Sequence, residues 1–105
     1  NDSEHLISEM LEFDRTIEAV FNFADEDKNT LAVITADHET GGAAIGDGNV
    51  EESLVEIKYI SEDHTATMIP IFSLGPYSSL FKGVYDNTEI FDKLEGIIKK
   101  WKKYF

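Results

Sequence analysis

Leu31-Ala-Val-Ile-Thr-Ala-Asp-His-Glu-Thr-Gly-Gly42 is the part of the sequence that decides the fold. Its first four residues form a continuous apolar run, which predicts a strand over residues 31–36 that is covered on both faces. Asp37 and His38 follow directly after that strand. In an open α/β sheet, ligands bind in the crevice beyond the carboxyl ends of the strands. A carboxylate and an imidazole at this place are donors for a divalent metal, zinc above all.

The residues before this strand predict a long helix. Apolar side chains recur at three- and four-residue steps from Leu6 to Ala24, which indicates an amphipathic helix of about five turns. The acidic run at residues 25–29 is expected to end it, and Asn29 can take the left-handed conformation typical of helix ends. A helix followed by a strand is half of a parallel βαβ unit, whose first strand would lie before residue 1.

Shorter elements are predicted after the Asp-His pair. Glycines favour turns around a short strand at residues 43–45, with one of these turns at Gly46–Asn49. Alternating apolar residues predict a half-exposed strand over Val55–Ile60. Another strand is predicted over Met68–Leu74, although Pro70 favours an edge position or the first residues of the strand.

The sequence ends in a second amphipathic helix. Asp86 and Glu89 have the spacing of a capping box, which places the start of this helix at Asp86. The apolar residues that follow form one continuous stripe: Ile90, Phe91, Leu94, Ile97, Ile98 and Trp101. Lysines in the last turns complement the helix dipole.

Composition and charge exclude several classes of function. The 105 residues are 42% hydrophobic, enough for one modest core and at most one domain. The sequence has no cysteine, so a disulfide framework and a thiolate metal site are both excluded. The 21 acidic and 9 basic residues give a net charge of −12, which disfavours binding to nucleic acid or to an anionic membrane. No apolar run approaches the roughly 20 residues of a transmembrane helix.

A second informative stretch is His64-Thr-Ala-Thr-Met-Ile-Pro-Ile-Phe-Ser-Leu-Gly-Pro76. In this order, the two stretches resemble the C-terminal part of the alkaline phosphatase family. The resemblance runs through nearly the whole chain, from Asn1-Asp2 to Gly83-Val-Tyr-Asp-Asn-Thr-Glu-Ile-Phe91. It implies that residues 1–105 are the C-terminal segment of a single domain, truncated at its N-terminal side. The fold expected is part of a three-layer α/β/α sandwich with a mostly parallel sheet.

The resemblance also implies a metal site. Asp37 and His38 resemble the ligands of one zinc ion, and His64 resembles a ligand of a second. Neighbouring strand residues point to opposite faces, so Asp37 and His38 can share an ion only if the backbone turns there. Glu39 and Thr40 could orient these ligands but are not assigned that role. Family members usually have small residues before the last histidine, and Glu62-Asp63 departs from that pattern.

The implied reaction is hydrolysis of phosphate monoesters by two zinc ions and a serine nucleophile, with magnesium at a third site. This chain holds no candidate for the serine, and Arg15, its only arginine, lacks the motif of the family's phosphate-binding arginine. These residues and the remaining ligands are expected upstream. The 105 residues alone are therefore expected to be inactive and to bind zinc weakly. The family further implies a homodimer located in the periplasm or secreted.

Two alternatives remain open. A phosphodiesterase or a phosphoglycerate mutase-type metalloenzyme of the same superfamily also carries an Asp-His pair after a strand. The Glu-Thr-Gly-Gly continuation favours the phosphatase over these relatives. A non-catalytic acidic module for binding or structure is the other alternative, and it predicts that zinc does not stabilise the fold. In that case Asp37 would cap a turn, and His64 would lie in a solvated acidic loop.

Overall fold

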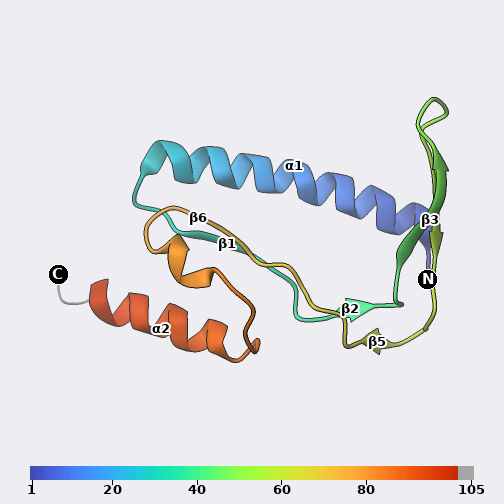
Figure 1. Ribbon diagram of the computed structural model, residues 1–105. Coiled ribbons are helices and arrows are strands. Elements are labelled where there is room, and N and C mark those ends of the chain that lie inside the picture. The colour runs from blue at the N-terminus through green and yellow to red at the C-terminus, as the bar shows by residue number, and fades with distance from the viewer. Residues whose placement is uncertain (102–105) are drawn as a thin grey trace. The chain divides into compact units, whose positions relative to one another are not determined.

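The computed structural model describes residues 1–101, which form two α-helices, six short strands and one 3-10 helix (Figure 1). Residues 102–105 lie outside the described part, as does the side chain of Trp101. The chain divides into two compact units. The first comprises residues 1–16 and 36–70, and the second begins with residues 17–35 and continues from residue 71. The long helix α1 (Ser3–Asp27) contributes residues to both units.

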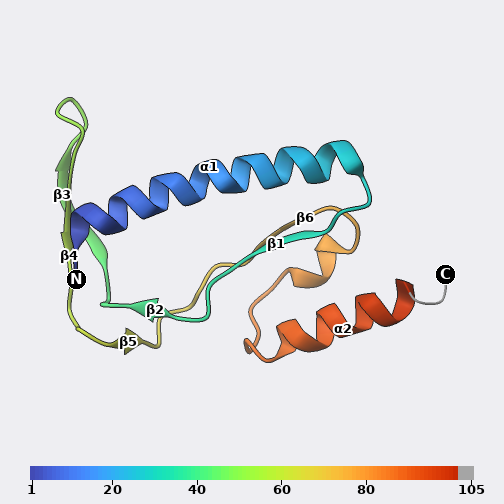
Figure 2. The ribbon, with the colours of Figure 1, turned by 180° about the vertical axis from the view of Figure 1, so that it is seen from behind.

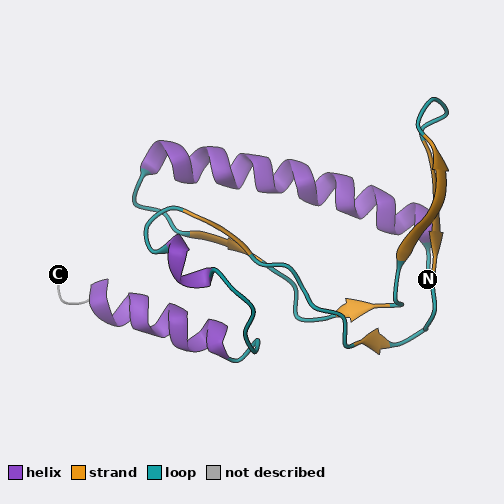
Figure 3. Cartoon of the chain, in the orientation of Figure 1, coloured by secondary structure: helices purple, strands orange, loops and turns teal. Residues whose placement is uncertain are grey.

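The first unit contains two antiparallel strand pairs. β2 (Glu39–Thr40) pairs with β5 (His64–Thr65), and β3 (Ala44–Asn49) pairs with β4 (Leu54–Lys58). Figure 3 shows these strands in orange, joined by teal loops. The β2–β5 pair is only two residues long on each side, and it lies where the sequence predicted metal ligands.

The start of α1 is fixed to the segment that precedes β5. The carboxylate of Asp2 accepts a hydrogen bond of 3.0 Å from the N–H of His5, which satisfies one of the free donors at the helix start. The side-chain amide of Asn1 donates a hydrogen bond of 2.9 Å to the carbonyl of Ser61. This bond connects the beginning of the chain to the loop that leads into β5.

The second unit contains the buried apolar residues. β1 (Ala32–Ile34) and β6 (Phe72–Leu74) pair in antiparallel register and lie side by side in both ribbon views (Figures 1 and 2). The 3-10 helix η1 (Ser78–Phe81) and helix α2 (Glu89–Trp101) follow. The buried hydrophobic side chains of the described residues are Ala24, Ala32, Phe81 and Ile97.

Both predicted helices are confirmed, with small differences at their ends. The left-handed residue after α1 is Lys28, with φ 60°, and not Asn29 as predicted. The side chain of Asp27 explains the shift, because it accepts a hydrogen bond of 3.1 Å from the N–H of Asn29 and so turns the chain one residue earlier.

Before the start of α2, the side chain of Asp86 forms a cap by accepting hydrogen bonds from Thr88. Its carboxylate accepts hydrogen bonds from the N–H and the hydroxyl of Thr88, at 3.0 and 2.8 Å. Glu89 does not complete the predicted capping box; its carboxylate lies 3.6 Å from the ammonium group of Lys93. The helix therefore begins at Glu89, three residues later than predicted.

The predicted turn at Gly46–Asn49 was wrong, because these residues belong to β3. The turn lies instead between β3 and β4, where the N–H of Ser53 donates to the carbonyl of Val50 at 3.2 Å. Close backbone approach inside the strand pair explains the glycine at position 48, and a Cβ atom on Gly46 would lie 2.7 Å from the side chain of Lys58. A Cβ atom on Gly48 would lie 2.8 Å from the backbone oxygen of Leu54.

The predicted strand at residues 68–74 is reduced to Phe72–Leu74. Pro70 has no N–H to donate, so the regular pairing begins only after it. All strand pairs within residues 1–101 are antiparallel. The parallel partner expected before residue 1 stays a prediction. In the described chain, neither α1 nor α2 combines the length and the apolar character that crossing a membrane requires.

Candidate metal centre

The structure brings the three predicted ligands together in the first unit. Asp37 and His38 lie between β1 and β2, and His64 is the first residue of β5. Because Thr40 pairs with His64 in the β2–β5 ladder, the backbone register places His64 beside the Asp-His pair. The rings of His38 and His64 stack, with their centroids 3.5 Å apart and their planes at 22°.

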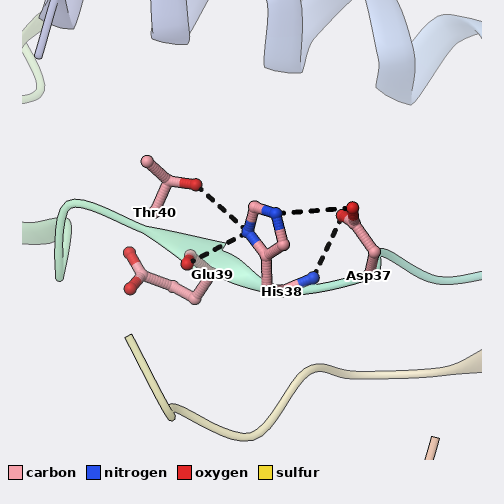
Figure 4. Close-up of polar contacts among 4 residues, drawn as sticks. All are labelled: Asp37, His38, Glu39 and Thr40. Atoms are coloured by element: carbon pink, nitrogen blue, oxygen red, sulfur yellow. Dashed lines mark hydrogen bonds and ion pairs between the residues drawn. The ribbon is translucent and has the colours of Figure 1, made fainter. Parts of the chain in front are cut away.

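Asp37 and His38 face each other across a gap that suits a metal ion (Figure 4). The Oδ2 atom of Asp37 lies 3.4 Å from the Nε2 atom of His38. Two ligand atoms of a tetrahedral zinc ion, each about 2.0–2.1 Å from the metal, lie about 3.3–3.4 Å apart. The turn that makes this possible is local, since the Oδ1 atom of Asp37 accepts a hydrogen bond of 3.0 Å from the N–H of His38. The donor set therefore fits zinc.

The other ring nitrogen of His38 is held by the backbone. Its Nδ1 atom lies 3.3 Å from the carbonyl oxygen of Glu39 and 3.3 Å from the hydroxyl of Thr40 (Figure 4). With the proton on Nδ1, the ring donates to the carbonyl and leaves the lone pair of Nε2 free. Metal-binding histidines are oriented in this way.

The carboxylate of Glu39 connects the Gly-Gly turn to β5. It accepts hydrogen bonds from the N–H groups of Gly42 and Ala43, at 3.0 and 2.9 Å, and from the hydroxyl of Thr65. The Thr65 hydroxyl, followed by the N–H of Ala43, lowers the pKa of Glu39 below its usual value. The pKa of Asp37 is also lowered, first by its own backbone N–H and then by that of His38. Both carboxylates are therefore ionised at neutral pH.

Gly41 and Gly42 let the chain turn tightly after β2. Their φ angles are 84° and 58°, a region that favours glycine. The N–H of Gly41 donates to the carbonyl of Asp63 at 2.9 Å, next to His64. A Cβ atom on Gly42 would lie 2.2 Å from the side chain of Ile60, so the close approach of the two segments requires glycine.

The centre is incomplete in the residues that the structure describes. Among residues 1–101, no three side chains of the His, Cys, Asp or Glu type gather where they could hold one ion. The assignment of Asp37 and His38 to one ion and of His64 to another stays a prediction. The sequence interpretation missed Thr65 as the partner of Glu39. Its only signal was a threonine directly after the histidine.

Comparison with known proteins decides the family. The sequence model of the family described as alkaline phosphatase matches residues 1–58. The chain belongs to the alkaline phosphatase family. Alkaline phosphatase 3 of Bacillus subtilis (strain 168) is 28% identical over 86% of this chain and 35% of its own length. The alkaline phosphatase of the Antarctic bacterium TAB5 is 39% identical, with a TM-score of 0.83 over 94% of this chain and 31% of that chain.

These relatives confirm the fold class predicted from the sequence. The chain corresponds to part of the α/β fold of alkaline phosphatases and spans about a third of the length of these two relatives. A mutant of the TAB5 alkaline phosphatase, also at a TM-score of 0.83, has been solved with Mg bound in its M3 site. Metal binding is thus documented for a structural neighbour of this chain.

Proposed function

We propose that this chain is the C-terminal segment of an enzyme that hydrolyses phosphate monoesters with metal ions and a serine nucleophile. Asp37 and His38 hold one zinc ion and His64 holds a second, while magnesium occupies a third site. The observation that supports this proposal most directly is the distance of 3.4 Å between Asp37 Oδ2 and His38 Nε2. The ring of His64 stacks on His38 beside this pair. The serine, the phosphate-binding arginine and the remaining ligands come from the part of the fold that residues 1–105 do not supply.

Asp37, His38 and His64 would hold zinc, which would supply Lewis-acid stabilisation of the charge that develops during phosphoryl transfer. The residues of this chain hold and orient the donors. Asp37 provides a carboxylate that stays ionised, and the Glu39 carbonyl directs the Nε2 atom of His38 away from the backbone.

The negative charge of the chain also favours a bound cation at a site that takes an anionic substrate. With a net charge of −12, the chain would repel a phosphate ester unless bound metal ions reverse the local sign. The proposal thus accounts for an anionic substrate on an anionic protein. It extends to a homodimer located in the periplasm or secreted, as the family resemblance implies.

Hydrolysis of p-nitrophenyl phosphate by the gene product that contains this chain tests the proposal. With zinc and magnesium present, we expect activity that His64→Ala lowers by about a hundredfold or more, because one metal loses a ligand. His5→Ala is the matched control, since His5 is an exposed histidine on α1 whose side chain pairs only with Glu9 in the described residues. Full activity of His64→Ala would contradict the ligand assignment.

A second substrate separates the alternatives. Hydrolysis of bis-p-nitrophenyl phosphate without hydrolysis of the monoester, by a folded protein with zinc bound, would replace the proposal by a phosphodiesterase. A protein that binds no zinc and hydrolyses neither substrate would match the non-catalytic module.

A further inference from the structure

The β2–β5 pair is too short to fix its own register. It joins only Glu39 to Thr65 and Thr40 to His64. Register in a sheet is set by burial of one face and by turn geometry, and short polar strands specify it weakly. A slip of one residue would move His64 by about 3.3 Å and turn its side chain to the opposite face. The stack of His38 on His64 therefore depends on something other than the ladder.

A hydrogen bond between the side chains of Glu39 and Thr65 fixes the register of β2 and β5. The two residues are direct cross-strand partners, and the Thr65 hydroxyl donates a hydrogen bond to the Glu39 carboxylate. The same carboxylate accepts the N–H groups of Gly42 and Ala43. Both side chains are half-buried, so water competes less for these bonds than at an open surface. One carboxylate thus joins β2, the Gly-Gly turn and β5.

This bond exists only in the observed register. In a slipped register another residue would lie opposite Glu39: Ala66, which has no hydroxyl, or His64 itself. The carboxylate would then keep its bonds to the turn and lose its bond to β5. The two oxygens of Glu39 already accept three hydrogen bonds, out of about four that a carboxylate can accept.

We propose that Glu39, through its hydrogen bond with Thr65, is the positioning residue that fixes the spacing between the Asp37-His38 donor pair and His64. The inference rests on the proposed function where it speaks of metal ions. Its geometric part, the control of the histidine stack, stands without them. The spacing of the two donor sets is a condition for two ions to act on one phosphoryl group.

The test uses the gene product that contains this chain, and the NMR signals of His38 and His64 are assigned by replacing each histidine in turn. At about pH 8, the metal-free wild type should show contacts between the ring protons of His38 and His64, whose ring centroids lie 3.5 Å apart. Thr65→Val, which removes only the hydroxyl, and Glu39→Ala should both lose these contacts. Thr65→Ser keeps the donor and should retain them.

Thr67→Val is the matched control, because it removes a hydroxyl two residues away that bonds to Thr65 and not to Glu39 in the described structure. It should keep the ring contacts. Zinc titration of the same variants, followed by calorimetry, should show an affinity about 10- to 100-fold lower for Thr65→Val and unchanged for Thr65→Ser. If Thr65→Val loses its helical circular dichroism, Thr65→Ala, which also removes the hydroxyl, takes its place with the same expected loss of ring contacts.

Each outcome bears on one claim. If the ring contacts persist in Glu39→Ala and in the Thr65 variant without a hydroxyl, Glu39 does not position His64. Ring contacts that are absent from the wild type also overturn the positioning role. Ring contacts that respond as expected in a chain that binds no zinc support the positioning role and count against the proposed function.

Discussion

At the scale of single residues, Asp37 divides its two oxygens between two tasks. One oxygen accepts the N–H of His38 and so turns the backbone, while the other faces the His38 ring. This local turn lets the side chains of two consecutive residues face each other, which regular strand geometry would not allow. The bonds that lower the pKa of Asp37 keep it in the charged form, which is the form that a metal ligand requires.

The substitution Asp37→Asn separates the hydrogen bond to the N–H of His38 from the negative charge that faces the His38 ring. The amide oxygen can still accept the N–H of His38, so we expect the ring stack to survive while the charge is lost. Zinc affinity should fall by at least about tenfold, since even loss of an outer partner of a ligand costs about 10- to 100-fold. Asp47→Asn is the control, because Asp47 accepts the N–H of Gly48 in the same way at 2.8 Å. Calorimetric titration with equal zinc affinity for both variants would contradict the ligand role of Asp37.

Asp86 gives a prediction on pH. The N–H and then the hydroxyl of Thr88 lower its pKa below 3.8, the value expected for the unfolded chain. A lowered folded-state pKa means that the cap stabilises fully above the unfolded value and loses its effect as pH falls through the folded value. Asp86→Ala should therefore lower the urea midpoint at about pH 7, with a smaller difference at about pH 3.

Asp86→Asn is the control for this experiment, since asparagine caps helices without titrating. It should remain close to the wild type at neutral pH. The same difference between wild type and Asp86→Ala at both pH values would contradict the assignment of the cap to the ionised carboxylate.

At the scale of elements, the end of α1 carries backbone strain. Lys28 takes φ 60° directly after the helix, and its N–H bonds to the carbonyl of Ala24 at 3.1 Å. Side chains with a Cβ atom disfavour this left-handed conformation, which glycine adopts freely. The ion pair of Lys28 with Asp25, although 2.8 Å long, is exposed and contributes little.

Lys28→Gly should therefore stabilise the chain by about 0.5–1 kcal/mol, after the greater freedom of glycine in the unfolded state is deducted. Lys28→Ala removes the ion pair and keeps the Cβ atom, so it should change the stability by less than about 0.5 kcal/mol. Thermal or urea unfolding measures both. A Lys28→Gly chain less stable than Lys28→Ala would show that the conformation is not strained.

The sequence predicts the elements unevenly, for physical reasons. Both helices could be predicted because 3.6-residue periodicity extends over many turns. The β2 and β5 strands could not, since two residues carry no periodicity. The glycines of β3 look like a turn because a sequence does not show the Leu54 carbonyl that lies against Gly48. Asp37, His38 and His64 could be named from their motif, but the Glu39–Thr65 bond needed the register.

At the scale of the whole molecule, few apolar side chains are buried. The apolar stripe predicted for α2 buries Ile97, whereas Phe91 and Ile98 remain 67% and 54% exposed. On α1, Met10 and Phe23 are 58% and 60% exposed. Periodicity identifies a face that can be buried and does not identify what covers it. The incomplete metal site among residues 1–101 is consistent with this, as is the coverage of only about a third of each relative's length.

The most direct measurement of the central claim is a zinc-edge anomalous difference map from crystals of the gene product that contains this chain. We expect one peak within about 2.0–2.2 Å of both Asp37 Oδ2 and His38 Nε2, and a second peak at a ring nitrogen of His64, about 4 Å away. Zinc bound elsewhere, or a map with no peak at these three residues in crystals grown with zinc, would contradict the account.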